Sequence, residues 1–236
     1  MIKAAEKASR ALIRDFGEIE KLQVSIKGPT DFVSNADLKA EKIIIEEWKK
    51  GRPNYSIISE EDGSESNKDK NNIWIIDPID GTTNFLHGVP HFAISIALKS
   101  KDEIVSGIIY DPIKDEMFYA EKNNGAFFNN QRIRVSKKKE INACLFASGG
   151  KSKKEIDLPI RKSGSAALDM AYVAAGRYDG YFQNDLNLWD IAAGIIILKE
   201  AGGTINEINL SQNKNIKIRA SSTAINEKML EKLSNF

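Results

Sequence analysis

Residues 74–85 have the sequence WIIDPIDGTTNF, and the rest of the chain is best interpreted around them. The continuous apolar run over 73–76 predicts a strand that is buried on both faces. Asp77 directly follows this run, and Pro78 favours an extended backbone at Asp77 while its ring fixes its own φ. Asp80 comes three residues later in an expected tight turn, so the two carboxylates can face the same point.

The residues after Asp80 favour a phosphate site. Gly81 permits close approach of the backbone, and the polar segment 82–84 can open a short helix, whose first N–H groups bind anions well. Two hard carboxylate ligands beside an anion-binding turn are the arrangement that a Mg²⁺-bound phosphate needs. The alternative is an ordinary strand, turn and helix N-cap without chemistry, because Asp and Gly are common in turns.

Acidic residues elsewhere in the chain can complete such a site. Glu60 and Glu61 directly follow a predicted strand, and strand ends are where α/β proteins place ligand residues; the alternative is a solvated acidic loop. Asp37 lies three residues after Ser34, which predicts a capping box that is compatible with a functional role. Asp190 opens an apolar helix, where the helix dipole or a metal ion would stabilise the carboxylate.

Hydrophobic periodicity alternates between helical and strand spacing along the chain. Helices are predicted over about 1–20, 34–50, 165–175, 189–201 and 226–233. Strands are predicted over 55–58, 73–76, 93–98, 103–110, 116–120, 126–128 and 178–183, with a polar loop over 60–72 and an antiparallel meander between 93 and 128. This order predicts an α+β fold with helices packed on more than one sheet. We expect a single domain over 1–236, with halves of about 1–140 and 141–236.

The composition argues against several classes of protein. The 236 residues include 34 Lys+Arg and 33 Asp+Glu, a formal net charge of +1, so nucleic-acid binding is not expected. No apolar run approaches the roughly 18 residues of a membrane-spanning helix, and the charged N-terminus lacks the apolar centre of a signal peptide. One cysteine (Cys144) and two histidines (His87 and His91) argue against a disulfide framework and against a Cys- or His-based metal site. We therefore expect a cytoplasmic protein whose chemistry depends on carboxylates.

Together these segments resemble the inositol monophosphatase family over nearly the whole chain. In the order of the family, the motifs are Asp31-x-Val33-Ser34-x-x-Asp37, Glu60-Glu61, the stretch 74–85, Gly164-Ser165-Ala166-Ala167, Trp189-Asp190 and Ala201-Gly202-Gly203. The resemblance implies a layered αβαβα sandwich of the sugar-phosphatase type. It also implies Mg²⁺-dependent, lithium-sensitive hydrolysis of a phosphate monoester by an activated water, without a covalent intermediate.

The resemblance further implies roles for individual residues. Two or three Mg²⁺ ions would bind, one to Glu60, Asp77 and the carbonyl of Ile79, and another to Asp77, Asp80 and Asp190. Glu60 and the Asp37–Thr82 pair would orient and deprotonate the attacking water, and Glu61 would support the metal site. The phosphate would be held by Gly81, Thr82 and Lys27, and the rest of the substrate by Asp80, Gly164, Ser165, Ala166 and Gln183.

The same resemblance guides the choice of substrate. The stretch 81–85 is more similar to the inositol-hydrolysing branch than to the branches acting on nucleotide bisphosphates or histidinol phosphate, so inositol 1-phosphate is expected. Gln183 departs from that branch, which usually has Glu there; Gln still forms hydrogen bonds but has no charge. Fructose 1,6-bisphosphate, a nucleotide 3′-phosphate and histidinol phosphate are the alternative substrates.

Two expectations concern partners. The family commonly forms homodimers, although the connection from Phe146 to Arg161 is shorter here than is usual, as if a surface helix were missing. The alternative to catalysis is a regulatory module on the same scaffold that binds a protein or an RNA. Its support is the basic runs 137–139 and 151–154, and such runs are usually solvated surface.

Overall fold

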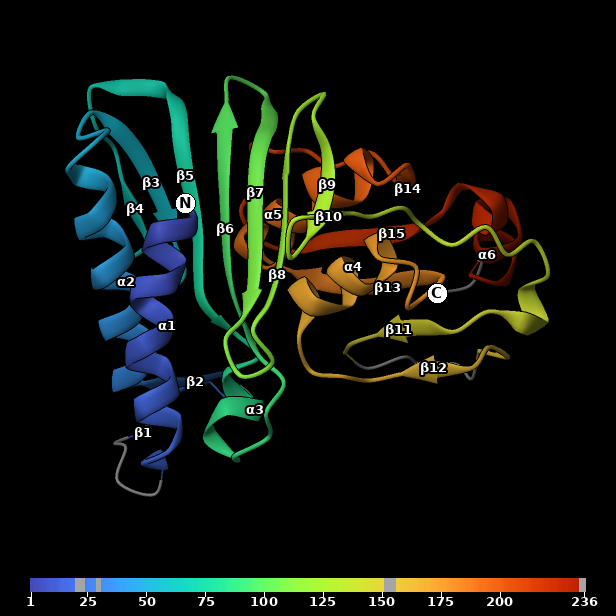
Figure 1. Cartoon of the computed structure of the whole chain (residues 1–236), viewed down its shortest axis with the longest axis horizontal. Helices are drawn as coiled ribbons and strands as arrows, with labels where there is room; N and C mark the ends of the chain where they lie inside the picture. The colour runs from blue at the N-terminus through green and yellow to red at the C-terminus, as the bar shows by residue number, and fades with distance from the viewer. Residues whose placement is uncertain (20–23, 29–30, 151–155, 234–236) are drawn as a thin grey trace.

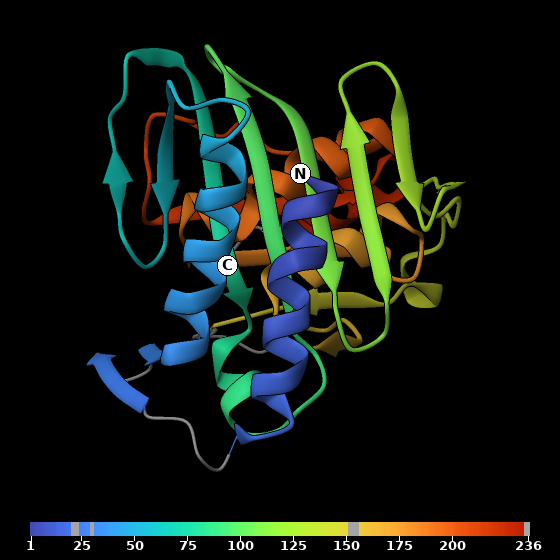
Figure 2. The same cartoon turned by 60° about the vertical axis from the view of Figure 1, so that its left-hand side comes forward.

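The structure is a computed structural model that describes residues 1–19, 24–28, 31–150 and 156–233. Its first layer consists of the amphipathic helix α1 (Ile2–Phe16) and helix α2 (Asn35–Lys49). The two helices lie side by side across one face of the larger sheet (Figure 2). Between α2 and this sheet, the indole of Trp48, a residue of α2, stacks on that of Trp74, with ring centroids 4.2 Å apart. The short strands β1 (Val24–Gly28) and β2 (Asp31–Ser34) pair with each other ahead of α2.

The second layer is an eight-stranded sheet in the order β10-β9-β8-β7-β6-β5-β3-β4. Its strands are β3 (Tyr55–Ser59), β4 (Ser64–Glu65), β5 (Asp69–Asp80), β6 (Ala93–Ser100), β7 (Glu103–Asp111), β8 (Glu116–Glu121), β9 (Gly125–Phe128) and β10 (Gln131–Arg132). The predicted antiparallel meander is confirmed over β6 to β9. The predicted loop over 60–72 is partly wrong, because polar residues there pair through their backbones with β3 at the exposed sheet edge.

The third layer is formed by α4 (Ala166–Ala174) and α5 (Leu188–Glu200), which pack between the two sheets (Figure 1). Helix α5 is apolar nearly all round because β6 and β7 contact one side and α4 and β14 contact others. Gly107 of β7 permits the closest approach: a Cβ there would lie 2.9 Å from backbone atoms of Ala193 and 2.7 Å from the side chain of Ile196.

The fourth and fifth layers are a five-stranded sheet, in the order β12-β11-β13-β15-β14, and the helix on its outer face. The strands are β11 (Phe146–Ser148), β12 (Ile160–Arg161), β13 (Gly180–Leu186), β14 (Gly203–Ile205) and β15 (Ile216–Ser222), and the helix is α6 (Asn226–Lys232). Phe146, Phe182 and Met229 fill the core between them, and Cys144 is buried beside it. The layers therefore follow the predicted order αβαβα.

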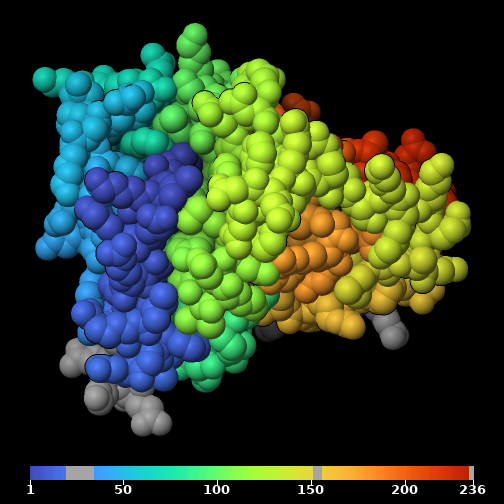
Figure 3. Space-filling model, viewed as in Figure 1, coloured from blue at the N-terminus to red at the C-terminus, as the bar shows by residue number. Residues whose placement is uncertain are grey.

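The two sheets come from successive parts of the chain, 55–132 and 146–222. The N-terminal helices and the C-terminal residues lie at opposite ends of the molecule (Figure 3). The described parts of the 146–161 connection contain β11 and β12 but no helix, while the basic run 151–154 lies outside the described residues. Among the helices that the structure describes, none is both long and apolar enough to span a membrane.

Candidate functional site

The parallel pairing of β3 with β5 brings the first two acidic positions together. Ser59 pairs with Ile76, and the N–H of Glu60 donates to the carbonyl of Ile76 at 3.2 Å. Because the carboxyl ends of adjacent parallel strands meet at one edge, Glu60 lies beside Asp77. The expectation that Glu60 follows a strand end next to Asp77 is thus confirmed at the level of the backbone.

An irregularity in β5 allows Asp77 and Asp80 to share one cavity. In a regular strand, residues three apart point to opposite faces of the sheet. The pairing of β5 with β6 shifts between Asp77, which faces Ser95, and Asp80, which faces Ala93. Such a shift redirects side chains. The strand extends to Asp80 instead of ending before it, so the predicted tight turn is this irregularity within β5.

Helix α3 (Thr82–Leu86) begins directly after Gly81, as predicted. Its N-cap, Gly81, has φ 101°, a conformation that favours glycine. A Cβ at Gly81 would also lie 3.2 Å from the carbonyl oxygens of His91 and Gly164. The Thr82 hydroxyl donates to the carbonyl of Ile79 at 2.9 Å, and the N–H of Ile79 donates to Asp77 Oδ1 at 3.0 Å.

Helix α4 reaches the same place from the second half of the chain. Its N-cap Ser165 donates its hydroxyl hydrogen to Asp80 Oδ2. The N–H groups of Ala167 and Ala166 donate to Oδ2 and Oδ1 of Asp80 at 2.8 and 3.3 Å. The carboxylate of Asp80 is therefore fixed by the helix of another layer.

Asp190 and Asp37 approach from two further helices. Asp190 lies in the first turn of α5 and accepts from the N–H of Asn187 at 2.8 Å, in a capping box. Asp37 lies in the first turn of α2 and is only 1% exposed. Its charge is near enough to contribute to the raised pKa of Asp77. The first-turn position at which the helix dipole favours Asp190 is thus confirmed, whereas the capping box predicted for Ser34 and Asp37 involves a side chain outside the described ones.

Most of the predicted site residues line one cavity of about 270 Å³. Its lining consists of the predicted residues Glu60, Asp77, Ile79, Asp80, Gly81, Thr82, Gly164, Ser165, Ala166, Gln183 and Asp190, together with Gly149, Gly150, Asp169, Leu186 and Asn187. Asp37 and Glu61 lie outside this lining, and Lys27 lies in β1, for which the structure describes the backbone. The volume is near the lower end of the range of about 300–1,000 Å³ for small-molecule sites, which favours a small substrate.

The electrostatics of the cavity favour a cation. Burial, followed by the charge of Glu60, raises the pKa of Asp77 well above its usual range, and Asp77 is 1% exposed. Burial raises the pKa of Asp80 to about 6, and burial together with Asp80 raises that of Asp190. None of the described residues that line the cavity is a lysine, arginine or histidine. Carboxylates collected in this way are stabilised by protons or by metal ions.

The donor set fits Mg²⁺, which prefers carboxylate and carbonyl oxygens. In the described part of the chain, however, no three His, Cys, Asp or Glu side chains already form a ligand set. Asp80 and Asp190 are engaged by the N-termini of α4 and α5, and Asp77 by the N–H of Ile79. A carboxylate oxygen has two lone pairs, so it can keep such a hydrogen bond while it binds a metal ion, and these hydrogen bonds hold the carboxylates in place.

Gln183 of β13 is held at the far side of the cavity. Its Oε1 accepts from the buried hydroxyl of Tyr181 at 2.8 Å. Gly149 packs against the amide group, since a Cβ there would lie 1.9 Å from Oε1. The side-chain oxygen of Gln183 is thus engaged by the protein. The NH₂ group is the part of the side-chain amide that can contact a ligand.

Sequence reasoning missed Glu41, which organises the loop after β3. Its buried carboxylate accepts from Ser59 Oγ at 2.9 Å, from Glu61 N at 3.1 Å and from Asp62 N at 2.8 Å. Burial raises the pKa of Glu41, while these hydrogen bonds lower it. The available signal was a charged residue on the buried face of α2, four positions after Asp37, where charges are rare unless they are paired.

A larger cavity, about 450 Å³, lies elsewhere, around the C-terminal end of α5. Its acidic side chains include Glu200, which accepts from the N–H groups of Asn123 and Gly125 at 2.8 Å, and Glu103, which is paired with Lys122. None of the predicted site residues lines this larger cavity, so the smaller acidic cavity is the candidate active site.

Known proteins share both the sequence and the fold of this chain. An inositol-1-monophosphatase from Rhizobium meliloti is 48% identical over 86% of this chain and 82% of its own length. A protein named Nus factor SuhB from Pasteurella multocida is 40% identical over 88% of this chain and 84% of its own length. The crystal structure of the extragenic suppressor protein SuhB from Bartonella henselae matches with a TM-score of 0.93 and 45% identity, over 100% of this chain and 97% of that one. A sequence model of the inositol monophosphatase family matches residues 1–235, and the chain therefore belongs to this family.

Proposed function

We propose that the protein is a Mg²⁺-dependent phosphomonoesterase that hydrolyses a small polyol phosphate, with inositol 1-phosphate as the first substrate. The observation that supports this best is the convergence of Glu60, Asp77, Asp80 and Asp190 on one small cavity whose described lining residues include none that is basic. Membership of a phosphatase family supports the same activity.

The metal ligands of this proposal are the four carboxylates and the carbonyl of Ile79, with two or three Mg²⁺ ions bound. Bound Mg²⁺ supplies positive charge that acidifies the attacking water and neutralises the phosphoryl oxygens. The raised pKa values of Asp77, Asp80 and Asp190 agree with this role, because the ionised carboxylates need a cation.

The other residues bind the substrate and move the proton. Glu60 accepts a proton from the attacking water, and Asp37 with Thr82 orients that water. Glu61, whose N–H is bound by Glu41, supports the metal site from the loop after β3. Gly81 and Thr82 place their amides at the start of α3 to bind the phosphate, together with Lys27 of β1.

The far side of the cavity selects the rest of the substrate, through Asp80, Gly164, Ser165, Ala166 and Gln183. Asp80 can accept a hydrogen bond from a hydroxyl. The NH₂ of Gln183 donates, whereas a glutamate at this position would only accept. A glutamine at position 183 therefore accommodates an anionic group of the substrate better than a glutamate would. This keeps fructose 1,6-bisphosphate, which has a second phosphate, among the alternative substrates.

The direct test is release of phosphate from inositol 1-phosphate by chelator-stripped protein, with and without added Mg²⁺. We expect release that depends on Mg²⁺. A panel with fructose 1,6-bisphosphate, a nucleotide 3′-phosphate and histidinol phosphate, ranked by kcat/KM, identifies the preferred substrate. Absence of release from every member of the panel with Mg²⁺ present would overturn the proposed function.

A second candidate is a role as a regulatory binding module, which the name of the Pasteurella relative favours. The test is a pull-down with the Asp77→Asn variant as bait at physiological salt. Retention of a specific protein or RNA by this variant, in the absence of phosphatase activity, would support binding as the main role. We further propose that the protein is a cytoplasmic homodimer, on the strength of the family resemblance, and light scattering tests the dimer.

A further inference from the structure

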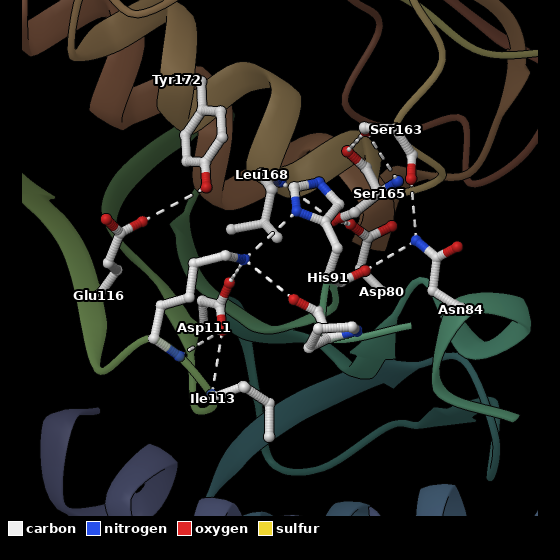
Figure 4. Close-up of polar contacts among 12 residues, drawn as sticks. Asp80, Asn84, His91, Asp111, Ile113, Glu116, Ser163, Ser165, Leu168 and Tyr172 are labelled. Carbon is white, nitrogen blue, oxygen red and sulfur yellow. Dashed lines mark hydrogen bonds and ion pairs between the residues drawn. The ribbon is translucent and has the colours of Figure 1, made fainter. Parts of the chain in front are cut away.

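The side-chain amide of Asn84 joins two backbone segments that are far apart in sequence. Its Nδ2 donates to the carbonyl of His91 at 2.7 Å and to the carbonyl of Ser163 at 2.9 Å. Figure 4 shows Asn84 reaching across from α3 to the turn before α4. A Cβ at Gly164 would lie 2.8 Å from Nδ2, so the turn packs directly on this amide.

The turn that Asn84 holds leads to Asp80. Ser163 donates its hydroxyl hydrogen to Asp169 at 2.7 Å, within the second half of the chain. Two residues later, Ser165 donates to Asp80, and Ala167 N donates to the same carboxylate at 2.8 Å. Asp169 ties the turn to its own helix, whereas Asn84 ties it to the segment that follows Asp80 in the first half.

We propose that Asn84 is a positioning residue: it docks the 163–165 turn on α3 and thereby sets where Ser165 holds the carboxylate of Asp80. This inference rests on the proposed function for the Mg²⁺ whose binding its test measures. Asn84 does not line the cavity, so it acts through the turn and not through contact with a ligand.

The chemistry of the junction explains the choice of an amide. Two carbonyl oxygens converge on one point, and an NH₂ group offers two donors without a charge. An aspartate of the same shape would present oxygens to oxygens. An alanine would leave both carbonyls without this donor and would leave the turn resting on packing alone.

The test compares Asn84→Ala and Asn84→Ser with Asn67→Ala. Asn67 is a matched control, because its Nδ2 also donates to a backbone carbonyl, that of Tyr55 at 2.9 Å, but at the outer edge of the sheet. The first readout is the Mg²⁺ concentration that half-saturates the rise in Tm, measured without substrate. We expect this concentration to increase about tenfold in the Asn84 variants and to change less than about twofold in Asn67→Ala.

A double-mutant cycle shows whether Asn84 acts through the turn. Ser165→Ala removes the hydroxyl that holds Asp80, so its effect on the Mg²⁺ midpoint should not add to that of Asn84→Ala, whereas it should add to that of Asn67→Ala. Equal midpoints for the Asn84 and Asn67 variants, or additive effects with Ser165→Ala, would overturn the proposal. If wild-type protein binds Mg²⁺ but hydrolyses no substrate, the proposed function fails and these binding readouts still decide the role of Asn84.

Discussion

The carboxylate of Asp80, at the end of β5, accepts the hydroxyl hydrogen of Ser165, the N-cap of α4, although the two residues are 85 positions apart in the chain. This contact crosses from the larger sheet to the helical layer behind it. The same carboxylate also accepts from the first N–H groups of α4. Asp80 is thus both a structural link between the halves and a proposed metal ligand.

The metal-free protein should lose stability as the pH rises through the range in which Asp80 titrates. Burial raises its pKa to about 6 from 3.8, so the folded state binds this proton more tightly than the unfolded state does. The contribution is complete below about pH 4 and is lost through about pH 6, with a size of roughly 3 kcal/mol. Unfolding of chelator-treated wild type and Asp80→Asn across this range measures it. The wild-type Tm should fall relative to that of the variant, and parallel curves would contradict the assignment.

Asp77→Asn should abolish activity and stabilise the metal-free protein. Asp77 is fully buried near other carboxylates, and a neutral amide removes the cost of its charge. We expect kcat/KM to fall about 10³-fold or more, and the metal-free Tm to rise by about 3 °C. The control is Asp102→Asn, an exposed carboxylate at the turn between β6 and β7, which should change neither quantity. Activity close to that of wild type in Asp77→Asn would exclude Asp77 as a metal ligand.

Glu41→Gln should impair the loop that contains Glu60 and Glu61. The carboxylate of Glu41 accepts three hydrogen bonds, and an NH₂ in place of one oxygen would face an N–H donor or the Ser59 hydroxyl. We expect activity to fall about tenfold at limiting Mg²⁺ and less at saturating Mg²⁺. Glu46→Gln, an exposed position on the same helix, is the matched control. An identical Mg²⁺ dependence in the two variants would show that Glu41 has no role in the site.

Gly107→Ala should destabilise the contact between α5 and the larger sheet. The added Cβ would meet backbone atoms of Ala193 at 2.9 Å, and backbone cannot turn aside as a side chain can. We expect a loss of about 1–3 kcal/mol in the free energy of unfolding. Gly51→Ala is the control, because a Cβ there meets nothing within 4 Å, and its change should be within about 0.5 kcal/mol. A similar small effect of both substitutions would show that the packing at Gly107 relaxes freely.

Local sequence patterns predicted the helices well and the strands unevenly. Helix α5 was predictable because nearly every position is apolar, and α3 because polar residues follow a glycine. Strands β1, β2, β4, β10, β11, β12, β14 and β15 were not predicted. Strands β4 and β14 are short. The exposed residues of β4 have no apolar alternation, so its conformation depends on pairing with β3. Strand β15 does alternate at its start, but the pattern over 216–220 is too short to indicate a strand by itself.

The sequence by itself determined the carboxylates at 77 and 80, the glycine that begins α3, and the family to which the chain belongs. The first two features depend on neighbours within a few positions, and the family shows in the order of short motifs along the chain. Tertiary structure decided which groups meet: the register that places Glu60 beside Asp77, the irregularity that aims Asp80 into the cavity, and the contacts of Glu41 and Asn84. These depend on pairing and packing between distant segments, which local residue preferences do not specify.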